Sequence, residues 1–139
     1  HGSTLRVAAP LERIPLYVKA GAVIPTWTGN PQTTMGYQPQ ELELQVWVPG
    51  QDAVVESVIH EDDGLTLDSS DSKYLKTLLK LERKGSSLRI SGTVVGRGYP
   101  EFARTSLRLT FEGQNAANLA PVVLANDGQD FEIQIELEG

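Results

Sequence analysis

The sequence predicts an all-β protein with the fold class of an antiparallel β-sandwich. Residues 41–48 and 131–137 alternate apolar and polar side chains, which is the two-residue period of a strand that buries one face. The 13 glycines and 8 prolines among 139 residues divide the chain into short strands separated by turns. This spacing is typical of a sandwich, and the length allows one compact core but not two full-sized domains.

The first half of the chain contains one clear strand and one expected hairpin. The strand at residues 41–48 ends at Pro49 and places four apolar side chains on one face, namely Leu42, Leu44, Val46 and Val48. Residues 53–59 are rich in β-branched side chains and are followed by the turn signal of Asp63 and Gly64. We expect residues 65–68 to return as the partner strand.

Residues 73–84 permit two interpretations. Leu75, Leu78, Leu79 and Glu82 fit the spacing of an amphipathic helix. However, Gly85, Ser86 and Ser87 form a hairpin-type connection, and residues 88–95 beyond them alternate again. We therefore predict two strands that form one long hairpin.

The second half adds strands at residues 105–112, 119–124 and 131–137. Two loops are expected from their glycine, proline and small polar residues, at residues 26–40 and 113–117.

Charge and composition exclude several function classes. Eighteen acidic against 12 basic side chains give a net charge of −6, which argues against a nucleic-acid partner and against an anionic membrane surface. The absence of cysteine excludes disulfides and thiolate chemistry, and His1 and His60 are too few for an imidazole metal cluster.

We expect a soluble protein, located in the bacterial cytoplasm. Because the chain opens with His1 and lacks an initiating methionine, we also expect a fragment of a longer protein.

The acidic run of Glu61, Asp62 and Asp63 is the strongest site-like feature. Catalytic carboxylates of glycosidases lie about 5 to 9.5 Å apart on opposite sides of a sugar, which neighbouring residues on one turn do not provide. A calcium site is an alternative because Ca²⁺ binds several carboxylate oxygens, although the EF-hand spacing is absent. Turn formation and solvation explain the run best, so we expect no cofactor other than this candidate calcium. His60 beside the run is expected to pack locally.

Three aromatic residues are candidates for contact with a sugar or another domain. Trp27 and Tyr37 lie in the expected loop, and Trp47 lies on the polar face of its strand. An aromatic ring offers a flat apolar surface for a pyranose, but exposed aromatic residues equally mark an interface. Both interpretations, and ordinary core packing, stay open at this point.

Several segments together resemble one known family. Residues 9–25 read APLERIPLYVKAGAVIP, residues 61–64 read EDDG, residues 98–100 read GYP, and Arg104 and Thr105 follow; the strand at residues 42–49 also matches. In this pattern, which covers roughly residues 5–112, the chain resembles the region after the catalytic barrel in glycoside hydrolase family 31, the α-glucosidase and α-xylosidase family. His60 departs from the tyrosine that is usual before the EDDG turn.

The resemblance implies an accessory role. Members carry a (β/α)8 barrel with two catalytic aspartates, followed by a proximal and a distal β-sandwich. By this likeness, residues 1–40 are the end of the proximal domain with a connecting loop, and residues 41–139 are the distal sandwich. No catalytic residue is carried over, and the expected partners are the barrel and the proximal domain of the parent chain. The alternative is a module that binds α-linked oligosaccharide.

Overall fold

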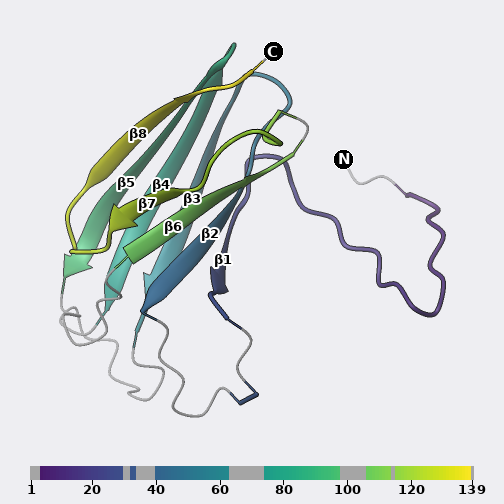
Figure 1. Ribbon diagram of the computed structural model, residues 1–139, viewed down its shortest axis with the longest axis horizontal. Coiled ribbons are helices and arrows are strands. Elements are labelled where there is room, and N and C mark those ends of the chain that lie inside the picture. Colours follow the sequence, from purple (N-terminus) through teal and green to yellow (C-terminus); the bar gives the residue numbers. More distant parts are fainter. Residues whose placement is uncertain are drawn as a thin grey trace.

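The computed structural model describes residues 4–29, 32–33, 40–62, 74–97, 106–113 and 115–138. In these residues the chain forms eight strands and no helix. The strands make two four-stranded sheets that pack face to face (Figure 1). The prediction of an all-β sandwich is therefore confirmed.

The first sheet, which we call sheet A, has the strand order β1-β2-β6-β7. Its strands are β1 (Val23–Trp27), β2 (Glu41–Trp47), β6 (Ser106–Glu112) and β7 (Val122–Ala125). Strands β1 and β2, like β6 and β7, pair antiparallel, but β2 and β6 run parallel. A parallel pair needs a long crossover connection, and three strands of the other sheet lie between β2 and β6 in the chain.

The second sheet, sheet B, has the order β3-β4-β5-β8, and all its neighbours are antiparallel. Its strands are β3 (Ala53–Glu61), β4 (Leu75–Lys84), β5 (Ser87–Arg97) and β8 (Phe131–Glu136). Strand β4 pairs with β5 from Lys84 to Leu75, which confirms the strand interpretation against the helical one. The predicted return strand at residues 65–68 lies outside the described residues.

The core lies between the two sheets. Every second residue of β2 and β6 is buried, and the same holds in β4 from Leu75 to Leu81. For β2 the alternation in the sequence predicted this. The largest side chains that are almost completely buried are Leu44, Val46, Leu81, Leu88, Ile90 and Leu109. Burying a side chain of this size stabilises the fold by about 1.5 to 3 kcal/mol. The buried residues of this core run from Leu42 to Leu137, and none of them lies in residues 4–20.

Two predicted boundaries were wrong, and proline is involved in both. Thr26 and Trp27 belong to strand β1, although a loop was expected from residue 26 onward. Pro25 concealed this strand, because proline is tolerated in a sheet only at an edge, which is where β1 lies. Strand β7 begins at Val122 rather than at residue 119, directly after Pro121, which has no N–H for the ladder.

Residues 4–20, here called the arm, form no strand and run away from the sandwich (Figure 1). The arm contains a turn in which the Arg13 N–H donates to the Pro10 carbonyl at 3.0 Å. It is anchored at its end, where the Gly21 N–H donates to the Trp47 carbonyl at 2.7 Å and the Trp47 N–H donates to the Ala22 carbonyl at 2.9 Å. Six large apolar side chains of the arm are exposed: Leu5, Val7, Leu11, Ile14, Leu16 and Tyr17.

Candidate functional site

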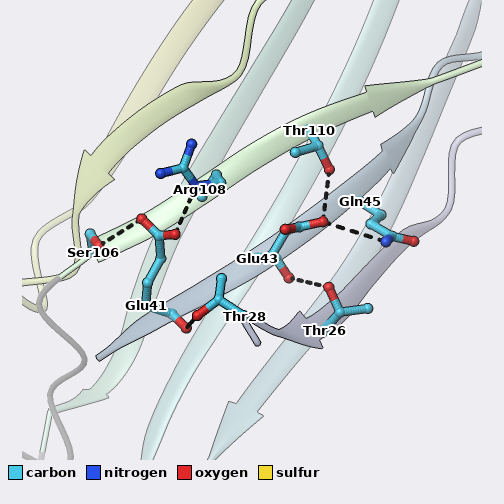
Figure 2. A network of polar contacts seen from close by, with 8 residues as sticks. All are labelled: Thr26, Thr28, Glu41, Glu43, Gln45, Ser106, Arg108 and Thr110. Carbon is cyan, nitrogen blue, oxygen red and sulfur yellow. Dashed lines mark hydrogen bonds and ion pairs between the residues drawn. The ribbon is translucent and has the colours of Figure 1, made fainter. Parts of the chain in front are cut away.

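The outer surface of sheet A carries a network of polar side chains, here called the polar face (Figure 2). It arises because the residues between the buried positions of β2 and β6 point away from the core. The parallel register sets these residues side by side, with Glu41 opposite Ser106 and Gln45 opposite Thr110. Residues 65 positions apart in the chain thus become neighbours.

Glu41 and Arg108 form the strongest contact of the polar face. The Arg108 Nε–H donates to Glu41 Oε1 at 2.7 Å, and the Ser106 hydroxyl donates to Glu41 Oε2 at 3.2 Å. The hydrogen bond from Arg108 lowers the pKa of Glu41, and the same bond raises the pKa of Arg108. The carboxylate is therefore ionised at neutral pH and links β2 to β6.

Glu43 extends the network to the other strands. Its Oε1 accepts from the Gln45 amide and from the Thr110 hydroxyl, both at 3.4 Å. The hydroxyls of Thr26 and Thr28 donate to the backbone carbonyls of Glu43 and Glu41, at 3.5 and 3.3 Å (Figure 2). The polar face thus joins three strands through contacts within the protein.

The side chains of the polar face have the arrangement of structural contacts and not of a catalytic pair. Glu41 and Glu43 project from the same side of one strand, so they do not face each other across a substrate as glycosidase carboxylates do. Arg108 neutralises one of them. The arrangement stabilises strand pairing and offers no acid and base pair for hydrolysis.

The lowered pKa of Glu41 predicts a pH dependence of stability. A carboxyl whose pKa is lower in the folded than in the unfolded state contributes stability above its unfolded pKa and loses it as the pH falls through the folded pKa. The variant Glu41→Gln should therefore lose less stability than the wild type on acidification from pH 7 to pH 3, measured by urea unfolding at each pH. Glu56→Gln, on the outer face of sheet B, retains the Glu41–Arg108 pair and should follow the wild type. Equal acid destabilisation of Glu41→Gln and wild type would contradict this prediction.

The two described aromatic candidates, Trp27 and Trp47, lie on opposite faces of sheet A. Trp27 ends β1 opposite Leu42, so it lies on the inner side of sheet A at the open edge, where it is 43% exposed. Trp47 lies on the polar face, as predicted, and is half-buried; its indole Nε1 is buried without a hydrogen-bond partner among the described residues. Tyr37 lies outside the described residues. The two tryptophans therefore do not form one surface.

The acidic run begins at the end of β3. Glu61 is the last residue of that strand, Asp62 follows it, and Asp63 lies outside the described residues. His60 packs locally, as predicted: its ring stacks on Tyr74 with centroids 5.2 Å apart, and its Nε2 lies 3.5 Å from Asp62 Oδ2. Within the described ranges, no group of three or more histidine, cysteine, aspartate or glutamate side chains could hold a metal ion.

The structure also contains a groove that the sequence did not indicate. It has a volume of about 640 Å³ and lies on the outer surface of sheet B, near the turn between β4 and β5. Its lining includes Asp52, Val54, Glu82, Lys84, Arg89 and Gln134. These residues come from the four strands of sheet B and from the turn before β3, so no local spacing could reveal the groove.

Neither a family model nor a curated protein matches the sequence. Among solved structures, the chain is similar to the GH31 dextranase of Flavobacterium johnsoniae in complex with glucose, with a TM-score of 0.78 and 17% identity over 94% of this chain. A mutant of that enzyme in complex with isomaltotriose gives the same values. This chain has the fold of part of a GH31 dextranase. It spans 21% of the length of that chain.

The part of the GH31-related fold that this chain contains includes no (β/α)8 barrel among the described residues. The described residues contain no helix, whereas a (β/α)8 barrel requires eight. For the same reason, the described part of the chain has no helix that could cross a membrane.

Proposed function

We propose that this chain is a non-catalytic β-sandwich module of a GH31 glycoside hydrolase, which packs against the preceding part of the parent chain and stabilises its catalytic barrel. The exposed apolar arm carries this proposal. The shared fold over one fifth of a GH31 enzyme supports it.

The arm has the pattern of two strands that lack a partner. Leu5 and Val7 alternate with polar or small residues before the turn at residues 10–13, and Ile14 and Leu16 begin a second apolar alternation after it. Monomeric proteins rarely expose a contiguous apolar surface of this kind, so the arm is expected to be covered by a partner. In our proposal it completes a sheet of the proximal domain. Since residues 23–27 belong to sheet A, residues 4–20 are the part available for that role.

The parent would act on α-linked glucose polymers with retention of configuration, and would need no cofactor. The substrate is proposed from the likeness to a dextranase, and the retention and the lack of a cofactor are proposed from the family resemblance of the sequence. Because the described residues provide no barrel, the purified 139-residue chain should not hydrolyse an aryl α-glucoside.

The proposed role of the arm can be tested by measuring whether this chain associates with the rest of the parent protein. A charge at position 16, which is 84% exposed on the arm, should abolish packing against a covering sheet because a buried charge is strongly destabilising. We expect Leu16→Asp to prevent co-purification of this chain with a separately expressed fragment that contains the barrel and the proximal domain. Val123→Asp, at an exposed position of β7, is the matched control and should co-purify normally. Equal co-purification of both variants would exclude the arm as the contact.

The size of the native polypeptide tests the proposal more directly. Immunoblotting and peptide mass mapping from the source cells should reveal a chain several times longer than 139 residues, with upstream peptides from an aspartate-bearing barrel. A native chain of about the calculated 15.1 kDa would overturn the accessory role.

Carbohydrate binding is a second candidate function. The groove on sheet B favours it, because ligand sites are commonly clefts of about 300 to 1,000 Å³.

Calcium binding at residues 61–63 stays a hypothesis, which is tested by whether a chelator lowers the melting temperature.

A further inference from the structure

The floor of the groove is one row of side chains across sheet B. Val54 on β3 lies opposite Glu82 on β4, Glu82 lies opposite Arg89 on β5, and Arg89 lies opposite Gln134 on β8. All four point outward because directly opposed residues share a face. With strands about 4.8 Å apart, the row spans about 14 Å, which suits an elongated ligand better than a single small molecule.

Glu82 and Arg89, in the middle of the groove, are already paired with charged neighbours, whereas Lys84 in its lining forms no ion pair among the described residues. Glu82 accepts from Lys80 at 2.8 Å and from Arg89, and Arg89 also lies 3.7 Å from Glu132. Asp52 Oδ1 accepts from the Gly85 N–H at 2.7 Å. A charged ligand that contacts Glu82 or Arg89 would have to compete with these pairs. A neutral ligand could use them intact, because an ionised carboxylate has about four acceptor sites.

The groove also offers apolar contact. Val54 is 61% exposed at one end of the row, and the aliphatic part of Arg89 lies in its middle. At the other end, the Gln134 amide donates to the Ser87 hydroxyl at 3.0 Å and retains its carbonyl oxygen as an acceptor. An apolar patch flanked by planar polar side chains matches a pyranose, which has a C–H face and a rim of hydroxyls.

We infer that this groove binds a neutral gluco-oligosaccharide. The inference rests on the proposed function for the identity of the sugar, and it places sugar contact on sheet B, away from Trp27 and Trp47 on sheet A. The C–H face of one glucose unit would lie on Val54, and the hydroxyls of the following units would bond to Glu82, Arg89 and Gln134. The module would then hold a substrate chain as well as support the barrel.

The test is a titration of the ¹⁵N-labelled 139-residue chain, whose core contains no residue of the arm, with isomaltotriose up to millimolar concentration. Amide shifts should be confined to residues 52–54, 82–89 and 132–136. Val54→Ala removes apolar contact and should weaken binding about fivefold. The matched control is Val58→Ala on the same strand and the same face, which is 57% exposed and should bind like the wild type.

Four outcomes would overturn the inference: no shifts, shifts around Trp27 or Trp47, equal weakening by both valine variants, or unchanged affinity of Val54→Ala. Gln134→Ala provides a second variant on an exposed position and should also weaken binding. A result that contradicts oligosaccharide binding in the groove can be distinguished from one that contradicts the proposed accessory role. If isomaltotriose does not bind but Leu16→Asp still prevents co-purification with the barrel fragment, only the groove inference fails.

Discussion

Replacing Gly21 by alanine is expected to lower the free energy of unfolding by about 2 to 4 kcal/mol. Gly21 has a φ of +83°, which costs an L-amino acid about 1 to 2 kcal/mol. A Cβ at this position would also lie 2.4 Å from Val55 Cγ2 on β3, so the added methyl overpacks the contact between the turn before β1 and sheet B. Urea unfolding monitored by tryptophan fluorescence measures the change.

Two variants separate these causes. Gly85 also has a positive φ, of +59°, but no atom lies within 4 Å of the position of a Cβ, so Gly85→Ala should show the backbone cost alone. The double variant Gly21→Ala/Val55→Ala removes the clashing methyls and should recover part of the lost stability relative to the sum of the single variants. A loss for Gly21→Ala no larger than that for Gly85→Ala would show that the contact with Val55 is unimportant.

Leu81→Ala should destabilise the protein by about 2 to 5 kcal/mol, whereas Leu78→Ala should cost less than about 1 kcal/mol. Both residues lie on β4, but Leu81 points into the core and is 1% exposed, whereas Leu78 points outward and is 39% exposed. Removing buried methyl groups loses their transfer free energy and leaves a cavity. The two free energies of unfolding are compared by urea denaturation.

This pair of variants also tests the conformation of β4 in solution. In the helical interpretation Leu78 shares the apolar face with Leu75 and Leu79, and Leu81 lies off that face. A helix would therefore make Leu78→Ala the more damaging change. That order of effects would contradict the strand and the hairpin.

The local pattern was sufficient for most strands but not for their pairing. Two-residue alternation identified β2, β5 and β8, because each buries one face against the opposite sheet. For β4, the turn at Gly85 decided between helix and strand. Strand β1 was missed because Pro25 is an unfavourable strand residue, and its edge position is a property of the whole sheet.

For the candidate sites, too, the sequence predicted which face a side chain lies on but not which residues become neighbours through strand pairing. The sequence correctly placed Glu41, Glu43 and Trp47 on an outward face. It could not indicate that Arg108 would bind Glu41, because the two are 67 residues apart and their contact depends on the parallel register of β2 and β6. The row of residues in the groove likewise depends on the registers of three strand pairs.

The parallel pairing of β2 with β6 has a consequence for folding during synthesis. Strands β3, β4 and β5 are consecutive in the chain and can pair as soon as they leave the ribosome. Sheet A must wait for β6, because the connection from Glu41 to Ser106 spans 65 residues. Sheet B in turn lacks β8 until residue 136 has emerged. The nascent chain therefore carries β2 without its neighbour β6 while residues 48–105 are being made, and chaperones have that interval in which to bind its apolar face.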